Sequence, residues 1–130
     1  MLELPITSIL TGAAAIMLVT LSLPIALRRR KLRLGAGDGG DQAFNRLIRA
    51  QANFIEYTPI ALIAIGLAEL AGQPQAVVSG LAAGLAAGRL LHAFGLITNV
   101  MVARALGAVL TFATLLAAGG LLLAGPIGLI

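Results

Sequence analysis

The segment RAQANFIEYTPIALIAIGLAEL, residues 49 to 70, decides how this chain folds. Its second half is apolar except for Glu69 and is typical of a membrane-spanning helix, whereas its first half carries an arginine, an asparagine and a glutamate. A helix rises about 1.5 Å per residue, so the segment is long enough to cross about 30 Å of hydrocarbon. Its polar side chains therefore need partners, and the surrounding sequence has to indicate what these are.

The rest of the chain also has the composition of a membrane protein. Hydrophobic residues make up 59% of the 130 residues and charged residues only 11%, with a mean hydropathy of +1.01. Soluble domains carry about 25% charged residues, so we expect an integral membrane protein in contact with membrane lipid. The net charge of +4 does not indicate nucleic-acid binding, because five of the nine basic residues lie at 28–33 beside an apolar stretch. Such clusters typically anchor the cytoplasmic end of a membrane helix.

Four stretches are long and apolar enough to span a bilayer, at residues 4–27, 46–71, 75–97 and 102–123. They predict an all-α, integral membrane four-helix bundle that forms a single domain over residues 1–130. The first stretch has no basic residue before it and no convincing cleavage site, so we expect it to be retained as an anchor. Basic residues cluster in the 28–45 linker and near the last turn. This asymmetry predicts a cytoplasmic linker and places both termini on the non-cytoplasmic side.

The polar residues of the second stretch recur at helical spacing. Arg46, Arg49, Asn53 and Glu56 step by three, four and three positions, and with Tyr57 they fall within about 100° of a helical wheel. Glu56 lies about 15 Å deeper than Arg46, where a charge costs on the order of 3 kcal/mol. We therefore expect this stripe to turn inward, toward a polar cleft.

Further polar residues on the other helices favour a ligand over a structural ion pair. A structural ion pair between Glu56 and one arginine would account for only two of these residues. The third stretch adds Arg89 and His92, and the fourth begins near Arg104. Arginine forks match carboxylates, so more guanidinium than carboxylate predicts an anionic ligand, whose ammonium group Glu56 would hold. Glutathione, with two carboxylates, one ammonium, two amides and a thiol, fits this pattern. One histidine, and no cysteine, predict no metal site.

The polar segment also resembles a known family. RAQANFIEYTP at 49–59, preceded by Arg46, is similar to the helix 2 signature of the MAPEG family, the membrane-associated proteins of eicosanoid and glutathione metabolism. GRLLH at 88–92 supports the resemblance, and GDGG at 37–40 resembles the bacterial branch. The family includes microsomal glutathione transferases. The resemblance implies a homotrimer, in a bacterial inner membrane, that binds glutathione between subunits near the cytoplasmic face.

The resemblance also implies roles for individual residues. Together with the polar stripe, it assigns glutathione contacts to Arg28, Arg46, Arg49, Gln51, Asn53, Glu56, Tyr57, Arg89 and His92. Arg28 of the adjoining subunit is expected to hold a carboxylate of glutathione. Arg104 lies near the family's helix 4 arginine and is the candidate catalytic residue that favours the thiolate. The thiolate would attack a lipophilic electrophile or hydroperoxide that arrives from the bilayer.

Two other functions stay open at this point. A small drug/proton antiporter also has four short helices and one buried glutamate, although arginines near that glutamate would repel a cationic substrate. A non-catalytic relative that binds lipid or glutathione would keep the same binding residues.

Two features outside the stripe carry structural expectations. Gly80, Gly84 and Gly88 are spaced four residues apart, which predicts a close-packing face within the bundle or between subunits. Glu69 lies on the opposite side of its helix, near the outer end. We expect it to be an interfacial residue with no chemistry.

Overall fold

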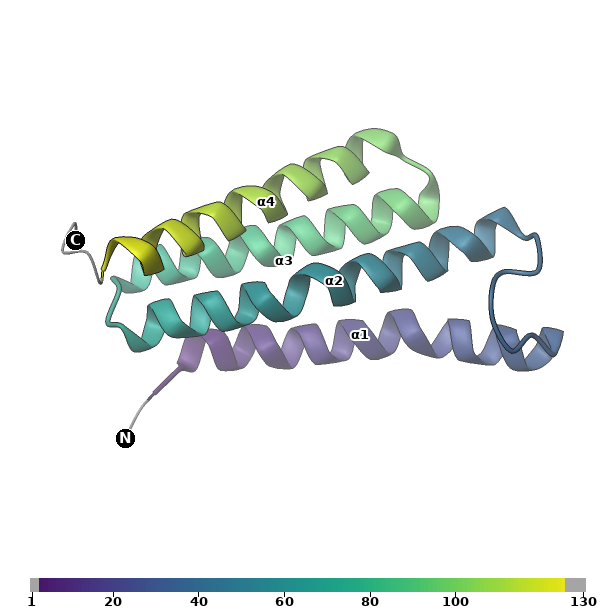
Figure 1. The fold of residues 1–130 in the computed structure, drawn as a ribbon, viewed down its shortest axis with the longest axis horizontal. Helices are drawn as coiled ribbons and strands as arrows, with labels where there is room; N and C mark the ends of the chain where they lie inside the picture. The colour runs from purple at the N-terminus through teal and green to yellow at the C-terminus, as the bar shows by residue number, and fades with distance from the viewer. Residues whose placement is uncertain (1–2, 126–130) are drawn as a thin grey trace.

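The computed structural model, which describes residues 3–125, consists of four helices joined by short connections (Figure 1). These are α1 (Pro5–Leu32), α2 (Gln42–Leu70), α3 (Gln75–Thr98) and α4 (Met101–Ala124). All four are long and apolar enough to cross a membrane. The prediction of an all-α fold with four candidate membrane spans is thus confirmed.

The helices around the basic linker are longer than the hydrophobic stretches that predicted them. α1 continues through the basic cluster because arginine, lysine and leucine favour helix and positive charge stabilises a helix C-terminus. It ends at Leu32, and the next residue, Arg33, is the C-cap with a left-handed φ of 55°. α2 begins directly after Asp41, whose carboxylate accepts a hydrogen bond of 3.0 Å from the Phe44 N–H. This bond lowers the pKa of Asp41, and the charge of nearby Arg28 acts in the same direction.

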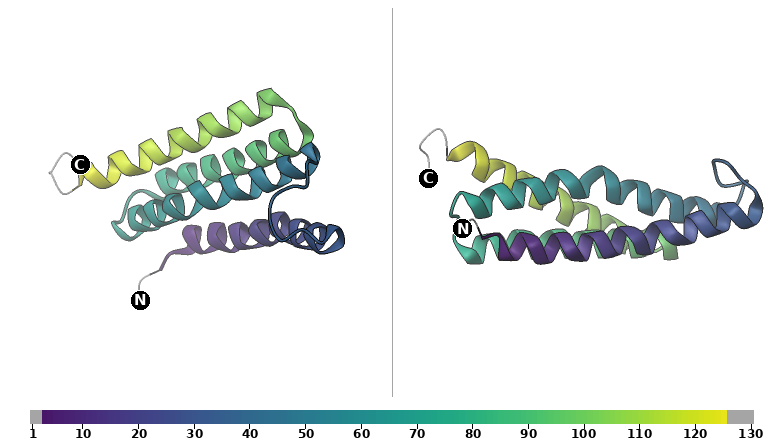
Figure 2. Two further views of the ribbon diagram at one scale, coloured as in Figure 1. Left: turned by 45° about the vertical axis from the view of Figure 1, so that its right-hand side comes forward. Right: turned by 90° about the horizontal axis from the view of Figure 1, so that it is seen from below.

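The helices run antiparallel, which brings particular helix ends together. The α1–α2 linker and the α3–α4 turn lie at one end of the bundle, and the α2–α3 turn lies at the other (Figure 1). α1 packs mainly on α2, while α4 packs on α3 and α2, so that α1 and α4 form opposite edges (Figure 2). Within residues 3–125, α1 and α4 make no contact with each other. One face of α2 is therefore left uncovered.

The start of α1 is fixed by a residue from the far end of α2. Leu4 provides no side-chain cap. Instead, the two carboxylate oxygens of Glu69 accept hydrogen bonds from the backbone N–H groups of Ile6, at 3.0 Å, and Thr7, at 2.9 Å. Glu69 thus satisfies two of the N–H groups that a helix N-terminus leaves without a partner. The sequence predicts an interfacial residue with no chemistry, and the structure adds this capping role at the same end of α2.

The glycine pattern of α3 is used for packing against α4 at two of its three positions. A Cβ at Gly88 would lie 2.7 Å from Thr111 Oγ1 and 3.1 Å from the Gly107 carbonyl oxygen, and one at Gly84 would lie 2.6 Å from a threonine hydroxyl of α4. Gly80 is exposed and would meet nothing within 4 Å. Each step of four residues turns about 40°, so Gly80 points about 80° away from Gly88. The expected close-packing face therefore does not extend to Gly80 within one chain.

Alanine at Gly88 should destabilise the protein, whereas alanine at Gly80 should not. Gly88→Ala should separate α3 from α4 at a cost of about 1–3 kcal/mol, which lowers the unfolding temperature in detergent by several degrees. Gly80→Ala should be neutral or stabilising, because alanine favours helix and the site is open. Equal unfolding temperatures of the two variants would show that the tight α3–α4 contact does not exist.

Candidate functional site

A polar cavity of about 200 Å³ lies between α2, α3 and α4. It is placed near the end of the bundle that holds the α3–α4 turn, because the antiparallel arrangement brings the start of α2, the end of α3 and the start of α4 together there. The side chains that line it are Asn45, Arg46, Arg49, Asn53, His92, Leu96 and Arg104. The cavity thus gathers five of the residues singled out in the sequence, from three helices.

The charge of this cavity is entirely positive. Three guanidinium groups line it, those of Arg46, Arg49 and Arg104, and none of its lining residues among 3–125 carries a carboxylate. The buried Nε of Arg46 has no hydrogen-bond partner among the described residues. Within residues 3–125, the ion pair formed is that between Arg28 and Asp41, outside the cavity. An anion with several oxygen acceptors would satisfy these donors.

Arg89 lies behind the cavity wall rather than on it. It is only 4% exposed. Its Nη1 donates to the Asn53 side-chain oxygen at 2.7 Å, while Nε and Nη2 donate to the Thr111 hydroxyl at 3.0 and 2.6 Å. Its Cζ also lies 5.6 Å from the centre of the Tyr57 ring. Arg89 therefore connects α2, α3 and α4 beside the cavity.

Besides Arg89 and Glu56, three candidate residues do not line the cavity in the single chain. Gln51 donates to Ser22 Oγ of α1 at 3.3 Å. The Tyr57 ring packs on Phe112 of α4 with 5.5 Å between centroids. Arg28 pairs with Asp41 and lies 5.1 Å above the Phe44 ring. Within one chain, their contacts hold helices together and do not form the cavity wall.

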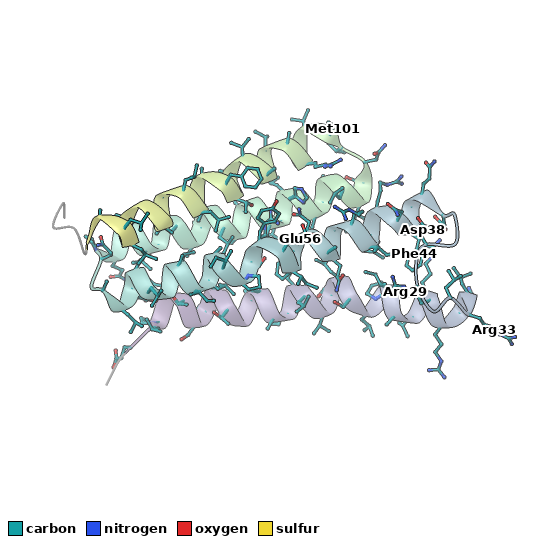
Figure 3. All side chains as sticks on the ribbon, viewed as in Figure 1. Arg29, Arg33, Asp38, Phe44, Glu56 and Met101 are labelled. Atoms are coloured by element: carbon teal, nitrogen blue, oxygen red, sulfur yellow. The ribbon has the colours of Figure 1, made fainter. Side chains whose placement is uncertain are left out.

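Glu56 is the middle residue of α2 and is exposed on the surface of the single chain (Figure 3). It lies two helical turns beyond Arg49 on the same face, and Arg49 is exposed as well. Within one chain, the expectation that the stripe turns inward is met for the half-buried Arg46, Asn53 and Tyr57. Arg49 lines the cavity although it is exposed, and Glu56 is exposed and lies outside the cavity. The reason is that no helix of the same chain covers this face of α2.

The structure adds residues that the sequence did not single out. Asn45 and Leu96 line the cavity, and Thr111, which is completely buried, holds Arg89. Asn45 lies four residues before Arg49 and Thr111 lies seven residues after Arg104, so helical spacing was a usable signal for both.

Comparison with known proteins gives one family and two relatives. The model of the MAPEG family matches residues 7–124. Inner membrane protein YecN of Escherichia coli strain K12 is 33% identical over 82 residues, and so is YecN of Escherichia coli O6:H1. The match covers 63% of this chain and 63% of each relative, so the chain spans less than two thirds of the length of these proteins. No solved structure matches the chain significantly.

Proposed function

This chain belongs to the MAPEG family, and from that premise we propose that it is a membrane-bound glutathione transferase or peroxidase. It activates the glutathione thiol for attack on lipophilic electrophiles or hydroperoxides. The observation that carries the proposal is the gathering of Arg46, Arg49 and Arg104 around one cavity that no carboxylate lines.

Glutathione provides the groups that this cavity lacks. Its two carboxylates offer acceptors to Arg46 and Arg49, including the unpartnered Nε of Arg46. Asn53 and His92 add neutral hydrogen-bonding groups to the wall. A cationic substrate, as an antiporter would carry, would meet three guanidinium groups instead.

The uncovered face of α2 supports assembly of the chain with further copies of itself, and membership of the MAPEG family makes a homotrimer the proposed form. Glu56 is exposed at mid-helix, where an unpaired carboxylate facing lipid would cost on the order of 3 kcal/mol. A neighbouring subunit placed on this face would remove Glu56 from lipid and would bring its own Arg28, exposed on α1, within reach of the ligand. Glu56 would then hold the ammonium group of glutathione.

The chemistry follows from the position of Arg104. A thiol is mostly protonated at neutral pH, and a nearby guanidinium favours the thiolate. The thiolate sulfur forms a bond to the electrophilic carbon, and the electron pair leaves with the departing group. With a hydroperoxide, the sulfur takes the distal oxygen and the product alcohol forms; a second glutathione then yields the disulfide and water.

We expect the protein in the inner membrane, as the names of its YecN relatives state for those proteins, with both termini outside the cytoplasm. The chain lacks cysteine, so single cysteines can be labelled cleanly at Ala36 in the linker and at Ala71 in the α2–α3 turn, which are both exposed. An impermeant reagent added to intact spheroplasts should label Ala71→Cys and leave Ala36→Cys unmodified until lysis. Labelling of both, or of Ala36→Cys alone, would overturn this orientation.

Glutathione conjugation with a generic aryl halide, measured beside a glutathione binding titration, tests the proposed function. The purified protein should bind glutathione and form the conjugate, and Arg30→Ala should behave like the parent because Arg30 is exposed on α1 outside the cavity. Binding without conjugation would favour the non-catalytic relative. Proton-coupled uptake of a cationic dye without glutathione binding would favour the antiporter.

A further inference from the structure

Asn53 is a neutral residue that both lines the cavity and accepts a hydrogen bond from Arg89. The Asn53 side chain lines the cavity, whereas Arg89 does not. Its amide has one acceptor, the oxygen, and one donor group, the NH₂. If the NH₂ group points into the cavity, Asn53 attracts a ligand oxygen; if the amide oxygen does, Asn53 repels it.

Arg89 determines this orientation. A guanidinium carries only donors, so the Asn53 atom that lies 2.7 Å from Arg89 Nη1 has to be the amide oxygen. The NH₂ group then points away from Arg89, which leaves it free to face the cavity that Asn53 lines. The orientation follows from hydrogen-bond chemistry and does not depend on telling nitrogen from oxygen by position alone.

Thr111 in turn determines the orientation of Arg89. Its hydroxyl accepts from Arg89 Nε and Nη2 and donates to the Gly107 carbonyl oxygen at 2.8 Å. Its one proton and two lone pairs are therefore all engaged. Because Thr111 is completely buried and the two bonds come from different nitrogens, the planar guanidinium is held in a single orientation.

We propose that Thr111 and Arg89 are positioning residues that fix the Asn53 amide as a hydrogen-bond donor toward the cavity. The Asn53 amide then donates into the cavity, as the lining arginines do. A ligand atom that meets Asn53 therefore has to be an oxygen acceptor, either of a carboxylate or of a peptide carbonyl. The inference deepens the proposed function and rests on it for the identity of the ligand. The orientation of Asn53 itself does not require glutathione.

Nuclear magnetic resonance of the side-chain amides tests the positioning without a ligand. The chain contains three asparagines, so selective ¹⁵N-asparagine labelling of the protein in detergent micelles gives few signals, and the Asn53 pair is the one lost in Asn53→Asp. Thr111→Val keeps the shape of threonine but removes the acceptor, and it should move the Asn53 pair toward the averaged shifts of a mobile amide. Thr111→Ser keeps the hydroxyl and should restore the parent position. An Asn53 pair that Thr111→Val leaves unchanged would overturn the inference, whether or not glutathione binds.

Glutathione titration tests the donor role. Asn53→Asp can still accept from Arg89, and its charge offsets that of a buried guanidinium, so the unfolding temperature should not fall. The variant presents a carboxylate where the parent presents NH₂, and it should weaken glutathione binding about tenfold or more. Thr111→Val should weaken binding about three- to tenfold, and Thr111→Ser less than twofold.

Parent-like affinity in a folded Asn53→Asp variant would show that Asn53 is only structural. The parent could fail to bind glutathione while Thr111→Val still shifts the Asn53 amide signals. That result would overturn the proposed function and leave the positioning of Asn53 intact.

Discussion

Replacing Arg104 with alanine is expected to slow glutathione conjugation about tenfold or more while the glutathione dissociation constant stays within a few-fold. Arg104 lines the cavity at the start of α4, whereas Arg46 and Arg49 both come from α2. Two guanidinium groups therefore remain to hold the carboxylates when Arg104 is removed. A charge that stabilises only the thiolate affects the rate more than the affinity.

The ultraviolet absorbance of the thiolate measures this effect directly. The signal of bound glutathione at neutral pH should be lost in Arg104→Ala and retained in Arg49→Ala, which should instead weaken binding. Arg89 is a poorer candidate for thiol activation, because its guanidinium is engaged by Asn53 and Thr111 behind the cavity wall. A thiolate signal that persists in Arg104→Ala and disappears in Arg89→Ala would assign the role to α3.

Replacing Glu56 with glutamine should weaken glutathione binding by about 1.5–3 kcal/mol, the range for a hydrogen bond to a charged group. This corresponds to about a 10- to 150-fold higher dissociation constant. Glutamine keeps the shape of the side chain and removes the charge that the ammonium group of glutathione would meet. The effect depends on Glu56 facing a ligand or a neighbouring subunit, since it is exposed on the single chain.

Glu69→Gln provides a matched control on the same helix. It removes the same charge, but Glu69 binds the backbone N–H groups of Ile6 and Thr7 at the start of α1, far along α2 from the basic cavity. Glu69→Gln should lower the unfolding temperature and leave the dissociation constant unchanged. If a folded Glu56→Gln variant binds glutathione as tightly as the parent, Glu56 has a structural role and does not bind the ligand.

The sequence predicts the helices well because hydropathy and helical spacing are local properties. The four spans and the spacing of Arg46 and Asn53 required only neighbouring residues to be read together. The ends of α1 and α2 were less predictable, because charged residues extend a helix beyond its apolar part. Asp41 begins α2 through a cap that hydropathy does not register.

The remaining features depend on which helices pack together. The contact of Glu69 with Ile6 joins residues 63 positions apart. Thr111 gains its role only because α3 and α4 approach closely at Gly88, and Gly80 lacks such a role because it points elsewhere. The exposure of Glu56 reflects a face of α2 that one chain leaves uncovered, which no pattern within α2 could show.

Isothermal titration of glutathione into the purified protein in mild detergent tests most directly whether the basic cavity is a glutathione site. The parent should bind glutathione saturably, at one molecule per chain, and the Arg46→Ala/Arg49→Ala double variant should lose this binding while it keeps its helical circular dichroism. Arg30→Ala, which removes an arginine outside the cavity, should bind like the parent. No binding heat from a folded parent protein, or equal binding by the double variant, would contradict the assignment of this cavity to glutathione.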